Sequence, residues 1–195
     1  MDWVSWAWLA AVALALAAFW DSARLTFGAA FLTRRSRARL ALGLIEAGAL
    51  GAWAALRYLG HLDRPLLPAP MAPAGALLGL ALTAAGAGLA AWAKLWLGRW
   101  FSMTFGVKPG HELVDDGPYA VTRHPIYTGL IAALVGSALV WDSALTLALA
   151  AVIAWSFTVH ARAEEALFEA HFGEVFAAYR RRVPRLLPWP RPRRG

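Results

Sequence analysis

The chain has 195 residues, of which 59% are hydrophobic and 16% are charged, whereas typical soluble domains carry about 25% charged residues. One soluble core of this size does not hold so many apolar residues, so the composition predicts a membrane protein. The net charge is +7, and the basic residues lie between or after apolar stretches, which favours anionic lipid head groups over nucleic acid as their partners. The absence of cysteine excludes disulfides, thiolate zinc sites and cysteine nucleophiles, and the histidine spacing predicts no metal site.

Apolar stretches of the length needed for transmembrane helices follow one another along the chain, because crossing about 30 Å of hydrocarbon takes roughly 20 helical residues. They cover about 3–20, 40–59, 74–97, 126–140 and 143–159. We therefore expect an all-α integral membrane protein of about five transmembrane helices, forming a single domain over 1–195. The first stretch lacks the basic start of a secretory signal peptide, so we expect it to be retained.

Turn residues define how these helices connect. A proline-rich connector with Pro65, Pro68, Pro70 and Pro73 separates the second and third spans. The short turn 141–143 predicts that the last two spans form an antiparallel hairpin. Each is short for a full crossing, and the sequence leaves open whether it crosses the bilayer or reaches only part way.

The basic residues predict the orientation. They concentrate in the loop 34–39, in the segment 99–123 and in the tail 160–195. Five spans place these regions on one face, and the positive-inside rule makes that face cytoplasmic. We expect a multi-pass protein of a bacterial inner membrane, with its N-terminus outside and its C-terminus in the cytoplasm. The proline- and arginine-rich end of the tail is expected to be disordered.

Small residues and one acid mark the membrane helices. Gly43, Ala47 and Gly51 share a face of the second span, and Gly75 and Gly79 share a face of the third. Such spacing lets helix backbones approach closely in lipid, although chance gives it often in a chain rich in alanine and glycine. Glu46 lies inside the second span, where a charge is costly and often functional, and its role stays open.

The segment 110–129 gathers polar and aromatic residues in front of an apolar helix. Pro125 suits the first helical turn, and the free N–H groups of a helix start favour an anion. Arg123 and His124 add positive charge, so this segment predicts a site for a carboxylate or a phosphate. The structural alternatives are a helix cap for His124 and a lipid-facing, snorkelling side chain for Arg123.

Glu164 and Glu165 follow the last span. A carboxylate there would bind the ammonium group of a ligand, and Tyr119 and Tyr127 would offer ring faces to a sulfonium. The two segments together would suit a zwitterionic ligand that carries a positive sulfur. S-adenosylmethionine meets this description, although composition alone does not single it out. The alternative is that the two glutamates form one solvated helix face.

Three motifs occur in order: LGRWF at 97–101, GHELVDDGPYAVTRHPIYTG at 110–129 and RAEEALFEAHFGEVFAAYRRRVP at 162–184. Together they resemble the isoprenylcysteine carboxyl methyltransferase family, and related membrane methyltransferases of phospholipids share the RHPxYxG core and the later acidic pair. The resemblance covers about 92–188. It implies a cytoplasmic site for S-adenosylmethionine that is not of the Rossmann type, formed by the loop before the hairpin and the C-terminal helix.

The resemblance also implies roles for individual residues. Eleven positions would contact the cofactor: His111, Glu112, Leu113, Val114, Tyr119, His124, Pro125, Ile126, Tyr127, Glu164 and Glu165. His160 stands where the eukaryotic enzymes have a substrate-binding arginine, and an arginine lies instead at Arg162. The candidate catalytic residues are Arg123, Arg162 and His160. Either arginine would orient a carboxylate acceptor, and His160 would be the base for an ammonium acceptor.

The leading hypothesis is therefore S-adenosylmethionine-dependent methyl transfer to a lipophilic acceptor, as a carboxyl O-methylation of the isoprenylcysteine type. One alternative is N- or S-methylation of a phospholipid or small amphiphile. An alternative of another class is a non-catalytic membrane protein that keeps the fold for binding or assembly. The expected partners are the lipid bilayer and a lipophilic or prenylated acceptor, without nucleic acid, and the oligomeric state stays open.

Overall fold

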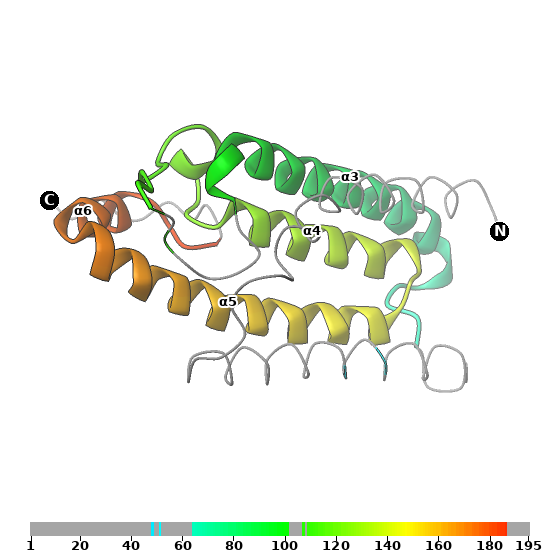
Figure 1. The fold of residues 1–195 in the computed structure, drawn as a ribbon. Coiled ribbons are helices and arrows are strands. Elements are labelled where there is room, and N and C mark those ends of the chain that lie inside the picture. Colours follow the sequence, from blue (N-terminus) through cyan, green and yellow to red (C-terminus); the bar gives the residue numbers. More distant parts are fainter. Residues whose placement is uncertain (1–47, 49–50, 52–63, 102–106, 108, 187–195) are drawn as a thin grey trace, which may run out of the picture.

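The computed structural model describes residues 48, 51, 64–101, 107 and 109–186, and every regular element within them is a helix. Three long helices run alongside one another (Figure 1): α3 at Ala72–Leu97, α4 at Pro125–Val140 and α5 at Ala144–Phe172. The shorter α6, Glu174–Arg182, follows α5 after a sharp bend. Single 3-10 turns lie at Ala69–Met71, Gly98–Trp100 and Gly117–Ala120. The all-α class is confirmed for these residues. The span expected at 3–20, the span expected at 40–59 except residues 48 and 51, Glu46 and the residues after 186 lie outside them.

Within the described part of the chain, two helices are long and apolar enough to cross a membrane: α3 with its flanking 3-10 turns, Ala69–Trp100, and α5. The bounds of α3 and α4 agree with the predicted spans 74–97 and 126–140 to within two residues. The helix α5 starts as predicted but continues past 159 to Phe172. Its later turns contain no glycine or proline, and it ends where Gly173 adopts a φ of 54°. The predicted tail 160–195 thus begins inside a helix.

Glycines hold the backbones of α3 and α4 against each other. A Cβ atom on Gly79 would lie 2.6 Å from the carbonyl oxygen of Gly136, and one on Gly86 would lie 2.5 Å from that of Gly129. Only glycine permits this approach, which supplies close dispersion contacts over the length of the pair. The small-residue prediction therefore holds at Gly79. Gly75 instead faces the side chain of Leu67.

The turn between α4 and α5 has the expected hairpin form. Asp142 takes a φ of 45°, and the Ser143 side chain caps α5 by accepting the backbone N–H of Thr146 at 3.0 Å. The Asp142 carboxylate accepts the backbone N–H groups of Leu66 and Leu67 at 2.8 and 2.9 Å. The connector before α3 is thereby fixed to the hairpin turn.

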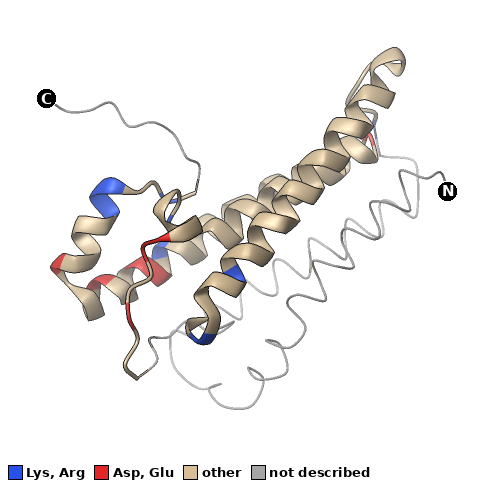
Figure 2. Cartoon of the chain, turned by 90° about the horizontal axis from the view of Figure 1, so that it is seen from above, with Lys and Arg blue, Asp and Glu red and all other residues tan. Residues whose placement is uncertain are grey.

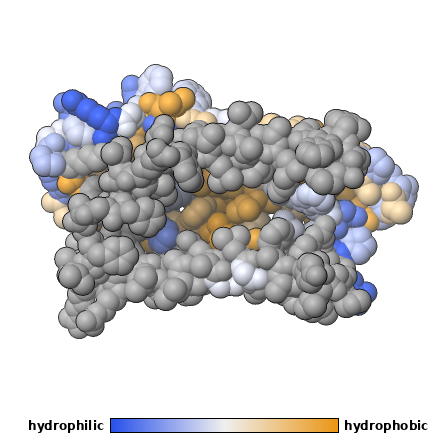
Figure 3. Space-filling view, turned by 45° about the vertical axis from the view of Figure 1, so that its right-hand side comes forward, coloured by the Kyte–Doolittle hydropathy of each residue, from blue (hydrophilic) through white to orange (hydrophobic). Residues whose placement is uncertain are grey.

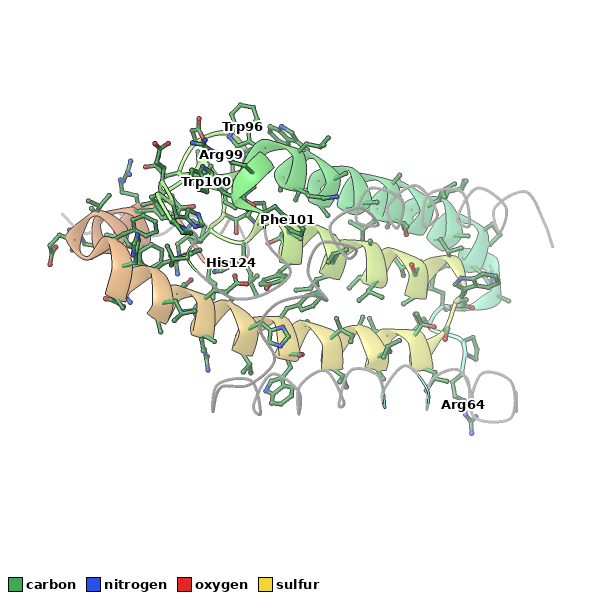
Figure 4. All side chains as sticks on the ribbon, viewed as in Figure 1. Arg64, Trp96, Arg99, Trp100, Phe101 and His124 are labelled. Atoms are coloured by element: carbon green, nitrogen blue, oxygen red, sulfur yellow. The ribbon has the colours of Figure 1, made fainter. Side chains whose placement is uncertain are left out.

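Polar and apolar residues separate along the helices. Among the described residues, the charged ones gather at the end that carries α6, and the middle of the long helices has few of them (Figure 2). Arg64 lies at the opposite end from Arg99 and His124 (Figure 4). In Figure 3, the visible hydrophobic residues lie mainly between hydrophilic ones at the two ends. Large apolar side chains are exposed on α3 and α5: Leu77, Leu78, Trp92, Leu95, Trp96, Leu147, Val152 and Trp155. This arrangement suits helices surrounded by lipid.

Candidate functional site

The candidate site forms at the charged end of the helices, where α4 begins and the second half of α5 passes it. His124, labelled in Figure 4, lies there between α4 and α5. Behind it, Phe176, Tyr179 and Val183 form a buried cluster with Leu113, Phe168 and Phe172. The Tyr179 hydroxyl donates to the carbonyl of Tyr119 at 2.7 Å, so α6 holds the loop that precedes α4. Burial raises the pKa of both tyrosines, and they stay neutral at physiological pH.

The chain after α6 pairs with the residues in front of α4. The backbone N–H groups of Arg123 and His124 donate to the carbonyls of Pro184 and Arg185 at 2.9 and 3.1 Å. The Thr122 hydroxyl donates to the Arg185 carbonyl at 2.8 Å. Pro125 occupies the first turn of α4, as predicted. The amides immediately before α4 therefore bond to the chain itself, not to an anion.

Glu165 is the centre of a buried ionic cluster. Its side chain is 4% exposed. Arg123 donates to its Oε1 from Nε at 2.9 Å and from Nη2 at 2.8 Å. Arg185 donates to Oε1 at 3.0 Å and to Oε2 at 2.7 Å. The remaining Nη1 of Arg123 donates to the carbonyls of Arg180 and Val183. The guanidinium of Arg123 thus faces protein groups, and two cations compensate the Glu165 carboxylate.

Glu164 lies beside this cluster in a different environment. Its side chain is 22% exposed, and it accepts the Tyr127 hydroxyl at 2.8 Å. The imidazole of His124 bridges the two acids: Nδ1 lies 3.3 Å from Glu164 Oε2, and Nε2 lies 3.3 Å from Glu165 Oε1. Burial disfavours the imidazolium, but both carboxylates outweigh it and raise the pKa of His124 above its ordinary value.

A row of rings leads from Glu164 along α5. The ring of Tyr127 stacks on His124 at 5.5 Å and on Phe157 at 4.8 Å between centroids. Phe157 lies 6.5 Å from the ring of His160. His160 and Glu164 are four residues apart on the helix and therefore share a face, whereas Arg162 is exposed on another face. The structure brings together Tyr127, His124, Glu164 and His160, and leaves Arg162 apart from them.

The predicted residues of the loop before α4 lie around a second aromatic group. His111 stacks on Trp100 at 4.8 Å and meets the edges of Phe168 and Phe172 at 5.9 Å. Other predicted positions differ in exposure: Glu112 is exposed, Leu113, Val114 and Ile126 are partly buried, and Tyr119 and Pro125 are buried. Figure 4 shows Trp100 at the end of α3 nearest this loop.

Two residues of this neighbourhood were missed from the sequence. Phe157 falls within an apolar stretch whose pattern gives no sign of a ring stacked on Tyr127. Arg185 falls within the basic tail, where it resembles any head-group arginine. The adjacent Pro184, which stops α6 from continuing, is the one local signal that Arg185 lies on an extended segment.

Comparison with known proteins shows which family and which relatives the chain is similar to. The family model described as Phospholipid methyltransferase matches residues 74–175. Over 79 residues the chain is 33% identical to the Protein-S-isoprenylcysteine O-methyltransferase of Schizosaccharomyces pombe, covering 40% of this chain and 34% of that protein. Over 84 residues it is 32% identical to Protein-S-isoprenylcysteine O-methyltransferase B of Arabidopsis thaliana, covering 40% and 41%.

A third relative is named for metal resistance and not for methyl transfer. Over 110 residues the chain is 32% identical to the Cobalt-zinc-cadmium resistance protein CzcN of Cupriavidus metallidurans, covering 56% of this chain and 49% of that protein. The matched stretches span about a third to a half of the length of these three relatives.

Proposed function

Because the chain belongs to the phospholipid methyltransferase family, we propose that it transfers a methyl group from S-adenosylmethionine to a lipophilic acceptor. The leading acceptor is a carboxylate of the isoprenylcysteine type, which the names of the relatives in fission yeast and Arabidopsis support. The family description favours a second candidate, the amine of a phospholipid. The observation that carries the proposal is the half-buried Glu164 beside stacked aromatic rings.

The described residues fit this cofactor by the chemistry of their groups. Glu164 offers a carboxylate that Arg123 and Arg185 do not neutralise, because both arginines bind Glu165. The rings of Tyr127 and Phe157 offer polarisable faces next to that carboxylate. When bound, S-adenosylmethionine supplies a methyl group on a positive sulfur that is open to in-line attack.

Each group of the chain then has a simple task. Glu164 accepts hydrogen bonds from the ammonium of the cofactor, and the Tyr127 hydroxyl holds that carboxylate in place. His111 and its neighbours up to Val114 line the rest of the cofactor site. Helix α6 and residues 183–186 cover one side of the site and exclude water, which favours alignment of the reacting groups.

The acceptor determines which residues of α5 act on it. A carboxylate is ionised at neutral pH and needs an orienting cation, for which Arg162 is proposed. An ammonium must first lose a proton, and His160 is proposed as the base. His160 shares the face of Glu164, so it is also the better placed of the two for a small acceptor. Arg123 is proposed to hold Glu165 and the tail instead of the acceptor.

We further propose the membrane arrangement predicted from the sequence: one domain of five spans with this site on the cytoplasmic side of a bacterial inner membrane. The separation of charged and apolar residues along α3 and α5 supports it (Figure 2). The short α4 would reach the far side with its turn residues.

Binding and turnover test the proposal separately. Isothermal calorimetry on the detergent-solubilised full chain should show S-adenosylmethionine binding, with competition by the demethylated product. Labelled methyl transfer should then be greater to S-farnesylcysteine than to phosphatidylethanolamine. The reverse preference would favour the phospholipid candidate. Folded protein that binds no cofactor would contradict the enzyme hypothesis and leave the non-catalytic alternative.

A further inference from the structure

Arg185 connects the C-terminal segment to the acidic pair, although it lies beyond the residues that the family model matches. Its guanidinium binds both oxygens of Glu165, at 3.0 and 2.7 Å. Its backbone carbonyl accepts the N–H of His124 at 3.1 Å and the hydroxyl of Thr122 at 2.8 Å. Arg185 therefore contacts Glu165 through its side chain and His124 through its backbone.

Arg185 and His124 compete for the same oxygen atom. Glu165 Oε1 lies 2.8 Å from the nearest nitrogen of Arg123, 3.0 Å from Arg185 and 3.3 Å from His124. The imidazole has the longest of these contacts, and the two guanidinium groups bind the same carboxylate. Its other nitrogen lies 3.3 Å from Glu164. An imidazole donates through both nitrogens only when it is protonated.

The consequence concerns the acid that is proposed to bind the cofactor. An imidazolium at His124 would form an ion pair with Glu164 and would repel the ammonium of a ligand there. Resting on the proposed function, we infer that Arg185 is a positioning residue of the cofactor site, which weakens the pairing of His124 with Glu164. Arg185 does this by compensating Glu165, which leaves less negative charge to stabilise the imidazolium than the two acids alone would provide.

The charged and titratable groups around His124 determine whether cofactor affinity rises or falls with pH. They are Glu164 and Glu165 from α5, Tyr127 from α4, Arg123 from its own loop and Arg185 from the tail. Below the pKa of His124 the imidazolium competes with the cofactor, and above it Glu164 is available, so affinity rises with pH through this pKa. Removing the positive charge of Arg185 leaves Glu165 less compensated and raises the pKa of His124. The rise in cofactor affinity with pH then moves to higher pH.

Calorimetric titrations of the full chain with S-adenosylmethionine, repeated across neutral pH, test this inference. Arg185→Gln should move the midpoint of the affinity-against-pH curve upward by about one pH unit or more, as expected for a charge lost within about 4–6 Å. Arg185→Lys keeps the charge and should keep a midpoint close to that of the wild type. Arg182→Gln is the matched control, because Arg182 is 67% exposed and pairs only with Asp115 among the described residues. The amino group of the cofactor titrates identically in every variant, so the differences between variants carry the result.

Histidine NMR titration of His124 in the same variants, without ligand, gives a second measurement. A folded Arg185→Gln protein with the wild-type midpoint would overturn the inference, and so would an equal shift in Arg182→Gln. If Arg185→Gln does not fold, Thr122→Val loosens the same segment without a change of charge. Thr122→Val should move the pH midpoint of His124 upward by less than Arg185→Gln is expected to. An unchanged midpoint would overturn the inference. A wild type that binds no S-adenosylmethionine would contradict the proposed function, and the NMR titration would still test whether Arg185 acts on His124.

Discussion

Glu164 and Glu165 are neighbours on α5, but the fold gives them opposite surroundings. Consecutive residues of a helix point about 100° apart, so Glu165 turns toward the loop and tail while Glu164 turns toward Tyr127. Glu165 is enclosed by two arginines, and the Glu164 side chain stays partly exposed. The same side chain can therefore hold the tail at one position and receive a ligand at the next.

Glu164→Gln tests the second of these roles. Loss of a charge-assisted contact worth about 1.5–3 kcal/mol should weaken S-adenosylmethionine binding by about 10- to 100-fold in calorimetry. Glu174→Gln serves as a control, since Glu174 is an exposed acid in the first turn of α6. Its affinity should match that of the wild type, and an equal loss in both variants would point to overall charge instead of a contact.

Arg162→Ala tests whether Arg162 contributes to acceptor binding and not to cofactor binding. Arg162 is exposed on a different face of α5 from Glu164, so its removal should leave cofactor affinity nearly unchanged and reduce methyl transfer to the acceptor. If Arg162→Ala weakens cofactor binding as much as Glu164→Gln does, the division of roles is wrong and His160 becomes the better acceptor contact.

The role proposed for Glu165 is tested by stability. Glu165→Gln leaves the buried guanidinium of Arg123 without its counter-charge, and breaking a buried pair costs about 3–5 kcal/mol. Glu169 lies one turn later and pairs with Arg180 at 3.0 Å, but both side chains are more than two-fifths exposed. Glu169→Gln should therefore cost less than about 1 kcal/mol. Equilibrium unfolding in mixed micelles measures both, and similar values would contradict the structural role.

At the scale of elements, hydropathy and turn residues predicted α3, α4 and the hairpin turn well. Each of these elements is determined by its own apolar length and by the breakers at its ends. The predicted span ends at 159, where charged residues begin, whereas the helix α5 continues to Phe172. Charge marks where a helix leaves lipid, whereas only a breaker such as Gly173 ends the helix itself.

The site was predictable only in part for a related reason. The motifs indicated that the loop before α4 and the segment after the last span form one site, with His124, Tyr127 and Glu164 among its candidates. No local pattern indicates that residues 183–186 return to the start of α4, because pairing between distant segments depends on the whole fold. The Arg123–Glu165–Arg185 cluster consequently appeared as three separate candidates or surface charges in the sequence.

The contact between α3 and α4 gives an element-scale prediction. A Cβ at Gly86 would meet the carbonyl oxygen of Gly129 at 2.5 Å, and backbone atoms yield only if the helices separate. Gly86→Ala should lower the free energy of unfolding by about 1–3 kcal/mol. Gly88 lies two residues away, and a Cβ there would meet no atom of a neighbouring segment within 4 Å. Gly88→Ala should therefore be neutral or stabilising by up to about 1 kcal/mol. Equal effects of the two substitutions would show that helix propensity, not packing, dominates.

At the scale of the whole molecule, helix length and charge placement support the proposed membrane arrangement. The 26 residues of α3 extend roughly 39 Å, more than the hydrocarbon thickness of about 30 Å. The 16 residues of α4 extend only about 24 Å. In the proposed arrangement, the Asp142 turn and the connector that it binds would lie in the polar layer at that end, and the loop before α4 with α6 would lie in the polar layer at the other.

The orientation of this body is the final prediction, and the absence of cysteine makes it simple to test. Pro68 belongs to the connector fixed to the hairpin turn, and Val175 on α6 is 63% exposed at the opposite end. Three helices separate them along the chain, so an odd number of crossings should place them on opposite sides. A membrane-impermeant maleimide should label Pro68→Cys in spheroplasts and should label Val175→Cys only after lysis, because the arginines of α6 favour the cytoplasm. Labelling after denaturation controls for the amount of protein. Equal labelling of both positions in spheroplasts would mean that an even number of these three helices crosses the bilayer, and the proposed cytoplasmic site would lose its support.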